Sequence, residues 1–231
     1  MTECLIIPAM GLGDWILINP IVRILSQRFD KVGLVYNDYN TTFVCHMFSD
    51  LPNVELTYNC KEWLPNVQLL MDSHCTPKGI TPINLRLSDP AKLDKPFNLV
   101  LYEQSGFNWY TDCIHYHVPI NETESKKLFK TFNLPERYVF LHEGNHPKID
   151  RSHINPELPV FSPTLIDNPF LYKYTIEAAE EIHVVDSGFY NFADKLKLPE
   201  RRFLHKTRTK LFASPFLDPK VNQQWIEIEY P

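Results

Sequence analysis

The sequence lacks a strong excess of charge of either sign and lacks a long apolar run. Its 231 residues include 23 Lys and Arg against 28 Asp and Glu, a formal net charge of −5 with both signs interspersed. This balance argues against a nucleic-acid-binding surface, and no segment has the pattern of a membrane span or a signal peptide. We therefore expect a soluble, cytoplasmic protein that binds neither nucleic acid nor membrane.

Cysteine and glycine are also sparse. The five cysteines are scattered, odd in number and without a CxxC pair, so they indicate free thiols in a reducing compartment and not a disulfide framework. Nineteen prolines against seven glycines predict stiff loops. Three of the glycines, Gly11, Gly13 and Gly188, lie in two short polar motifs, which are the first places to look for a site.

The N-terminal half opens with an apolar run at residues 4–10, which predicts a buried parallel strand. A helix with apolar residues at helical spacing follows, with Arg23 on its opposite face and Pro20 in its first turns or at a kink. Further strands are expected at 32–36, 54–58 and 97–102. The first strand, helix and second strand then form a right-handed crossover between parallel strands.

A second α/β unit begins near residue 136. Its strands are expected at 138–143, 158–163, 182–185 and 201–205. A helix is expected over 168–182, capped by Asn168 with Pro169 at its first position, and another helix follows the third of these strands.

The length and hydrophobic content set the domain organisation. A content of 44% over 231 residues is enough for one large domain or for two small ones of about 110 residues each. Because two α/β units of similar length follow one another, we place a boundary after residue 134. Residues 1–134 and 135–231 are then predicted to form two Rossmann-like domains with a cleft between them.

The stretch from His142 to His146 fits the letter pattern H-E-x-x-H, which on a helix would place two zinc ligands and a general base together. The flanks do not predict a helix. An apolar run typical of a strand precedes the stretch, Gly144 lies inside it, and Pro147 disfavours the α region for the residue before it. We predict a strand end and no metal. His142 and Glu143 become cleft candidates, because ligands bind at the carboxyl ends of strands in open α/β sheets.

The first polar motif, Gly11 to Asp14, directly follows the first strand. Its two glycines, Gly11 and Gly13, let the backbone turn tightly and come close to a ligand. The dinucleotide fingerprint requires a third small residue at position 16, which here is Ile16, so NAD binding is not favoured. The residues alone leave two interpretations of Asp14 open, helix capping and a role at a ligand site.

The second polar motif is Asp186-Ser187-Gly188, between a strand and a helix. Such a turn directs backbone N–H groups at whatever lies above the sheet, which suits a diphosphate, although Asp186 or Ser187 could equally cap the helix. Four cations flank strand ends in this half: Lys148, Arg151, Lys206 and Arg208. A diphosphate requires such partners, and a solvated basic face is the alternative for each of them. His205, at the end of the last strand, is a further cleft candidate.

Two segments resemble glycosyltransferase family 9, the heptosyltransferase group. PAMGLGDWILINPIVRILSQRFD, residues 8–30, is similar to the family's N-terminal motif, in which Gly-Asp follows the first strand and a helix comes next. IEAAEEIHVVDSGFYNFADKL, residues 176–196, is similar to the family's donor-site segment of strand, Asp-Ser/Thr-Gly and helix. The two segments hold 23 and 21 of the 231 residues, about one fifth of the chain.

The resemblance implies a GT-B-like fold, in which two small Rossmann-like domains with parallel sheets face a cleft. It implies an inverting transfer from a nucleotide-diphosphate sugar, bound by the C-terminal domain, to a hydroxyl of a glycan or glycoconjugate acceptor on the N-terminal side. Asp14 falls on the position of the catalytic base, and Asp186, Ser187 and Gly188 fall on the donor-binding turn. The chain departs from the pattern at Asn191, where the family has a histidine. It is also short, like the trimmed transferases of large DNA viruses, which leaves the acceptor open.

The residues present are consistent with that chemistry. A carboxylate takes the acceptor proton, and general-base catalysis contributes ~10²–10⁴-fold. Either a metal or protein cations and a helix N-terminus stabilise the departing diphosphate. Because no DxD-type acidic cluster occurs, we expect no metal or other cofactor. A nucleotide-sugar epimerase or hydrolase on the same fold, and a non-catalytic nucleotide- or glycan-binding module, remain the alternative interpretations.

Overall fold

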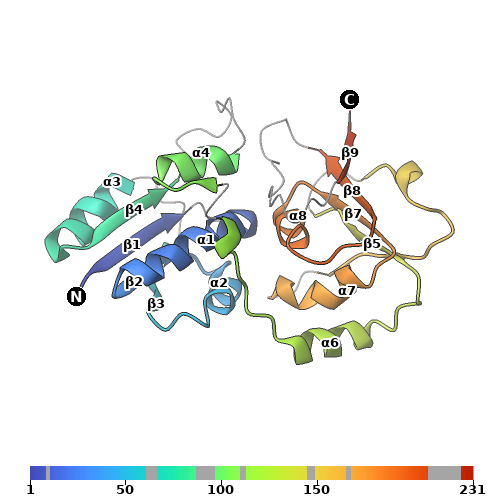
Figure 1. The fold of residues 1–231 in the computed structure, drawn as a ribbon, viewed down its shortest axis with the longest axis horizontal. Helices are drawn as coiled ribbons and strands as arrows, with labels where there is room; N and C mark the ends of the chain where they lie inside the picture. The colour runs from blue at the N-terminus through green and yellow to red at the C-terminus, as the bar shows by residue number, and fades with distance from the viewer. Residues whose placement is uncertain are drawn as a thin grey trace. The chain divides into compact units, whose positions relative to one another are not determined.

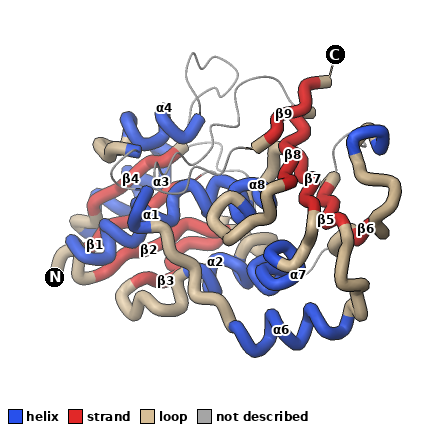
Figure 2. The backbone as a smooth tube through the Cα atoms, turned by 45° about the vertical axis from the view of Figure 1, so that its right-hand side comes forward, coloured by secondary structure: helices blue, strands red, loops and turns tan. Residues whose placement is uncertain are grey.

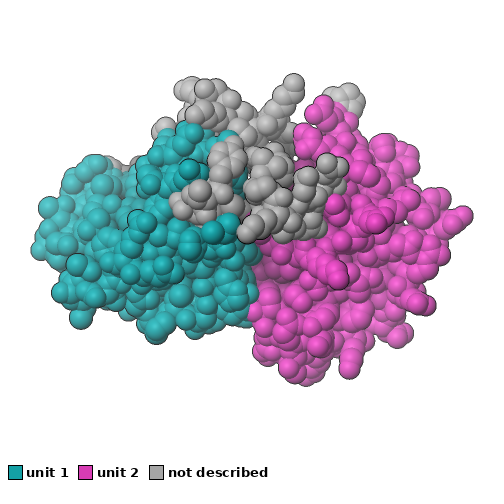
Figure 3. Space-filling model, viewed as in Figure 1, with its two compact units in different colours: residues 1–119 teal, residues 120–231 magenta. Residues whose placement is uncertain are grey.

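The computed structural model describes most of the chain and divides it into two compact units. The described residues are 1–8, 11–60, 67–86, 97–109, 113–144, 149–164, 168–207 and 225–230. Unit 1 spans Met1–Pro119 and unit 2 spans Ile120–Pro231 (Figure 3). This division falls 15 residues before the domain boundary predicted after residue 134.

Unit 1 contains a sheet of four parallel strands in the order β3-β2-β1-β4 (Figure 1). The strands are β1 (Glu3–Pro8), β2 (Lys31–Tyr36), β3 (Val54–Asn59) and β4 (Thr81–Leu85). The three strands predicted nearest the N-terminus are confirmed. β4 was not predicted, and its Pro82 is tolerated because β4 lies at the edge of the sheet.

The helices of unit 1 correct two sequence predictions. They are α1 (Leu12–Arg28), α2 (Thr41–Met47), α3 (Val67–Leu70), a π-helical turn (Met71–Cys75), α4 (Phe97–Gln104) and 3₁₀ turns at Thr76–Lys78 and Cys113–His115. The strand predicted at 97–102 is wrong, because Phe97 and Leu101 are buried four residues apart, which is a helical face. Pro20 lies in the third turn of α1, deeper than predicted, so the carbonyl of Ile16 loses its helical N–H partner.

Arg23 of α1 is buried, against the prediction that it lies on a polar face. Its guanidinium donates to both carboxylate oxygens of Asp50 at 2.9 Å and to the carbonyl of His117 at 2.8 Å. Asn19, one turn earlier, exchanges two hydrogen bonds with the backbone of His117. This arrangement fixes the end of unit 1 onto α1. The pKa of Asp50 is lowered chiefly by its hydrogen bonds with Arg23.

Unit 2 contains a sheet of five parallel strands in the order β6-β5-β7-β8-β9 (Figure 2). The strands are β5 (Val139–His142), β6 (Val160–Phe161), β7 (Glu181–Val185), β8 (Arg201–Lys206) and β9 (Ile226–Glu229). The first four were predicted, and β9 was not. The strand reading of the H-E-x-x-H stretch is confirmed for His142, and His146 lies outside the described residues.

The helices of unit 2 are short. They are α6 (Glu122–Thr131), α7 (Lys173–Glu177), α8 (Gly188–Ala193) and 3₁₀ turns at Arg151–His153 and Pro169–Tyr172. Asn168 caps the last of these turns, as predicted, but the helix expected to reach residue 182 ends at Glu177 because β7 begins at Glu181. α6 packs on this region, where the Ser125 hydroxyl donates to the carbonyl of Leu171 at 2.7 Å. This packing is why α6 belongs to unit 2 and why the boundary precedes it.

Each sheet has a buried apolar face. In unit 1, Leu5 and Ile7 of β1 pack against Val35, Leu70 and Ile80. In unit 2, residues of β5 and β7 pack with Ile149, Ile154 and Leu158. Burying each such side chain contributes ~1.5–3 kcal/mol. The α/β fold with two parallel, Rossmann-like sheets is therefore as predicted.

Candidate functional site

The order of the strands marks one position in each sheet where a ligand is expected. In unit 1 the chain passes from β1 outward to β2 and β3 and then returns to β4 on the other side of β1. In unit 2 it passes from β5 to β6 and then returns to β7 on the other side of β5. Open α/β sheets bind ligands outside the carboxyl ends of the strands at such reversals. The two positions are therefore the carboxyl ends of β1 and β4, and of β5 and β7.

The Gly11–Asp14 motif lies at the first of these positions. Gly11 is the residue before α1, and the Asp14 carboxylate accepts a hydrogen bond from the Gly11 N–H at 2.9 Å. Asp14 is thus at the third position of the helix and not at its N-cap, and it is half-buried. A Cβ added at Gly11 would lie 3.0 Å from Asp14 Oδ2, so the glycine leaves room for the carboxylate.

The Asp186-Ser187-Gly188 motif lies at the second position, at the end of β7. Ser187 is the residue before α8, with extended backbone at φ −158° and ψ 177°, but its hydroxyl makes no capping hydrogen bond. Instead Ser187 Oγ lies 3.5 Å from Nδ1 of His142, the last residue of β5. The hydroxyl and the imidazole therefore span the reversal between β5 and β7. Asp186 is largely buried beside them.

An aromatic ring that the sequence analysis missed supports His142. Phe189, in the first turn of α8, stacks on the His142 imidazole with ring centroids 4.1 Å apart and planes at 26°. Phe189 is itself half-buried against Tyr172. The only sequence signal was an aromatic residue directly after Asp-Ser-Gly. The stacking limits the rotation of the imidazole and keeps Nδ1 directed at Ser187.

The described cations of the predicted donor site are already paired with carboxylates. Arg151 donates to Glu143 at 2.8 Å, and the other Glu143 oxygen accepts from the Ile149 N–H at 2.9 Å. Lys206 forms ion pairs with Glu227 and with Glu229 of β9. Lys148 and Arg208 lie outside the described residues.

His205 is fully buried and is not exposed to a cleft. Burial chiefly lowers its pKa to about 3, so that the imidazole is neutral. Its ring nitrogens contact His183 and Tyr230. The prediction that His205 lines a ligand cleft is therefore wrong for this side chain.

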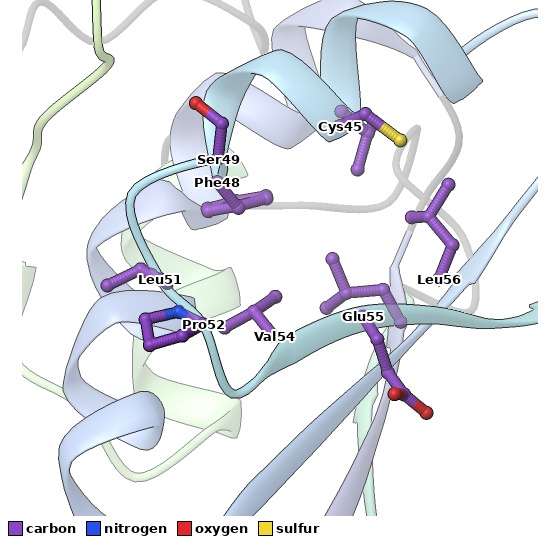
Figure 4. A pocket seen from close by; sticks show the side chains of 10 residues that line it. Cys45, Phe48, Ser49, Leu51, Pro52, Val54, Glu55 and Leu56 are labelled. Carbon is purple, nitrogen blue, oxygen red and sulfur yellow. The ribbon is translucent and has the colours of Figure 1, made fainter.

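A pocket of about 360 Å³ lies between α2 and β3 of unit 1 (Figure 4). Its wall is mainly apolar, and the Glu55 carboxylate at its rim is paired with Lys31 at 2.6 Å. It is formed by the first half of β3 and the end of α2, so it does not include the carboxyl ends of the strands. A diphosphate requires cations and N–H donors, which this wall does not offer.

Neither a membrane-spanning helix nor a metal cluster is found in the described part of the chain. None of the described helices is long and apolar enough to cross a bilayer. Among the same residues no group of three or more His, Cys, Asp or Glu is placed to hold a metal ion.

Comparisons with solved structures identify the fold. A glycosyl transferase of family 9 from Veillonella parvula DSM 2008 superimposes with a TM-score of 0.60 at 11% identity, covering 99% of this chain and 87% of the other. The chain has the fold of a family 9 glycosyltransferase. The ADP-heptose LPS heptosyltransferase II of E. coli superimposes with a TM-score of 0.53 at 14% identity, covering 98% and 90%. No protein-family model and no curated protein matches the sequence. The likeness to these proteins is therefore one of fold, without a match in sequence.

Proposed function

We propose that the protein is an inverting glycosyltransferase that transfers a sugar from a nucleotide-diphosphate sugar to a hydroxyl of a glycan acceptor. The observation that carries the proposal is the position of the two polar motifs. Asp14 and the Asp186-Ser187-Gly188 turn lie at the strand-order reversals of the two sheets, and the fold is that of family 9 glycosyltransferases.

In this proposal Asp14 is the general base. Its carboxylate takes the proton of the acceptor hydroxyl while the hydroxyl oxygen attacks the anomeric carbon. The bond from that carbon to the diphosphate oxygen breaks, and the electron pair leaves with the nucleoside diphosphate. One displacement from the opposite face inverts the configuration. Base catalysis of this kind contributes ~10²–10⁴-fold.

The donor diphosphate is proposed to bind at the end of β5 and β7. The Ser187 hydroxyl and the backbone N–H groups that follow it donate to the phosphates. α8 has only six residues, so few peptide dipoles add up and the helix contributes little to anion binding. The positive charge must then come from side chains, with Arg151 and Lys206 as the described candidates and Lys148 and Arg208 as the others. Because protein cations supply this charge, we expect no requirement for a divalent metal.

The test begins with binding. The protein is screened by thermal shift against UDP-, GDP-, CMP-, dTDP- and ADP-sugars, and release of the nucleotide is then measured with and without mixed glycan acceptors. We expect one nucleotide class to stabilise the fold and an acceptor to accelerate its release. Release that acceptors do not affect would indicate a hydrolase or epimerase, and binding without release would indicate a binding module. Stabilisation by none of the nucleotides would overturn the proposal.

The Ser187→Ala variant tests the donor turn. It removes the hydroxyl near His142 but no helix-capping hydrogen bond, so the fold should be unaffected. A lost hydrogen bond to a phosphate should weaken nucleotide binding by about tenfold. Ser73→Ala, at an exposed position of unit 1 whose hydroxyl donates to the Leu69 carbonyl, is the matched control and should bind as the wild type does.

A further inference from the structure

Four side chains of unit 2 form a continuous buried hydrogen-bond chain that the proposed reaction does not use. Glu181 Oε1 lies 2.7 Å from His183 Nε2, and His183 Nδ1 lies 2.8 Å from His205 Nε2. His205 Nδ1 lies 2.7 Å from the Tyr230 hydroxyl. Glu181, His183 and His205 are each fully buried. The chain crosses the sheet from β7 through β8 to the residue after β9.

With both imidazoles neutral, the protons of this chain have only one consistent arrangement. Glu181 also accepts from Arg201 Nε at 2.6 Å and from the Asn155 N–H at 3.1 Å, so it is the ionised acceptor at one end. His183 then donates from Nε2 and accepts at Nδ1. His205 likewise donates from Nε2 and accepts at Nδ1, which leaves the Tyr230 O–H as the final donor.

The histidine pKa values agree with this arrangement. Burial is the largest cause lowering the pKa of His183, and it lowers the pKa of His205 to about 3. Both rings are therefore neutral near pH 7, and each has one N–H. A neutral imidazole donates from one nitrogen and accepts at the other. Because Glu181 can only accept, every hydrogen bond of the chain is donated in the direction from Tyr230 towards Glu181.

The far end of the chain holds the backbone at the proposed donor site. The Tyr230 O–H donates to His205, and the Tyr230 oxygen accepts a hydrogen bond from the Asp150 N–H at 3.1 Å. The residues on either side of Asp150 are held by Glu143, which accepts from the Ile149 N–H and from Arg151. The segment 149–151 is therefore fixed from two directions.

The C-terminal segment is also attached to the other side of the reversal between β5 and β7. Trp225, directly before β9, donates from Nε1 to Asp194 Oδ1 at 2.7 Å, at the end of α8. Its ring packs edge-on against Tyr190 of the same helix, with centroids 5.2 Å apart. Residues 225–230 thus contact both α8 and the segment 149–151.

We propose that Tyr230 and His205 are positioning residues that hold the segment 149–151, and with it Arg151, in place for the diphosphate of the donor. The proposal rests on the function proposed above only in naming the ligand. The positioning itself is a statement about the Asp150 N–H, and it can be tested without any ligand.

The first test uses Tyr230→Phe, which keeps the ring and removes the hydroxyl. Amide exchange at Asp150 should become about three- to tenfold faster, because a hydrogen bond of ordinary strength is lost. Tyr174→Phe is the matched control, since the Tyr174 hydroxyl bonds to Glu122 on the surface of the same unit. It should leave exchange at Asp150 unchanged. Equal exchange at Asp150 in Tyr230→Phe and wild type would overturn the proposal.

Histidine side-chain NMR provides a signature that general destabilisation would not give. In the wild type, His183 and His205 should both be neutral Nε2–H tautomers, with signals assigned from the His183→Gln and His205→Gln variants. Tyr230→Phe removes the donor to His205 Nδ1, so the Nδ1 resonance of His205 should move while that of His183 moves less. An Nδ1–H tautomer at His205 in the wild type would overturn the direction of the chain and the positioning role of His205, and the Asp150 exchange in Tyr230→Phe would still decide the role of Tyr230.

The second test measures the consequence for binding. Among ADP, GDP, UDP, CDP and dTDP, the nucleoside diphosphate that the wild type binds best is the probe. Tyr230→Phe should weaken its binding by about three- to tenfold, and Tyr174→Phe should leave its binding unchanged. If the wild type binds none of the five, the proposed function fails, and the Asp150 exchange result still decides the positioning. Faster exchange with unchanged affinity would show that the segment is held but is not used for the diphosphate, which refutes the role proposed for it.

Discussion

Replacement of Asp14 by asparagine separates the two roles that its position permits. The carboxylate accepts the Gly11 N–H at the start of α1, and in the proposed reaction it also takes the acceptor proton. Asparagine keeps an acceptor oxygen for Gly11 but is not a base. The loss of negative charge at a helix N-terminus should reduce the free energy of unfolding by ~0.3–1 kcal/mol. Turnover should fall ~10²-fold or more, which corresponds to a barrier higher by about 2.7 kcal/mol.

Two further variants control for a purely structural effect. Asp14→Glu places the residue preferred at the third helical position, so stability should be retained, but the displaced carboxylate should reduce turnover by ~10²-fold. Gly11→Ala introduces a Cβ 3.0 Å from Asp14 Oδ2 at an ordinary φ of −82°. The helix should persist, and turnover should fall because the carboxylate must shift.

The assay is nucleotide release at saturating donor and acceptor, with stability followed by chemical denaturation and donor affinity by titration calorimetry. If Asp14→Asn retains turnover within threefold of the wild type while losing stability, Asp14 is a helix cap and the base assignment is refuted. If all three variants lose donor affinity in parallel with turnover, the residue binds the donor and is not the base. Only a loss of turnover with affinity retained supports the proposal.

Three other outcomes follow from the structure. Nucleotide release should be unaffected by EDTA, and activity lost to EDTA and restored by Mn²⁺ would contradict the proposed cation-based stabilisation. The pKa of His205 is about 3 in the folded protein and 6.5 in the unfolded chain, so the unfolded chain takes up a proton that the folded protein does not. The free energy of unfolding should therefore fall by ~1.4 kcal/mol for each pH unit as the pH is lowered from 6.5 to 3. His205→Gln should flatten that slope in denaturation curves. Arg23→Met should cost ~1.5–3 kcal/mol in urea unfolding because it leaves Asp50 without its guanidinium partner and removes one of two donors to the His117 carbonyl, whereas Arg137→Met, at an exposed pair with Glu180, should change little.

Most of the strands were predictable because each is a local apolar run bounded by turn residues. β1, β2 and β5 are buried on both faces, so their sequences are mostly apolar. β7 is equally buried, and its apolar residues alternate with Glu181 and His183 before Val184 and Val185. The signal fails for two of the four edge strands, β4 and β9. β4 contains Pro82, and β9 is a strand of only four residues in which isoleucines alternate with exposed glutamates. The sequence of neither strand therefore differs clearly from that of a loop.

Polar side chains were harder to predict than strands, because their partners are distant in the sequence. Arg23 has the sequence context of a solvent-facing helix position, and its burial depends on Asp50 and on the His117 carbonyl 94 residues later. His205 was predicted at a cleft because it ends a strand. Its partner Tyr230 follows a strand that was not predicted, so nothing in the sequence indicated that the ring is enclosed.

The positions of the two motifs show which part of the site depends on topology. The sequence shows that Asp14 follows one strand and Ser187 another, but it does not show which strands are neighbours. In unit 2 the first strand, β5, lies between β6 and β7 only because the chain crosses to the other side of β5 after it has formed β6. This reversal separates the connections on the two sides of β5, and it brings His142 and Ser187, 45 residues apart, to 3.5 Å. In unit 1 the corresponding reversal requires β4, the strand that the sequence did not predict. The chemistry of each motif is therefore local, whereas its placement at a ligand site is a property of strand order.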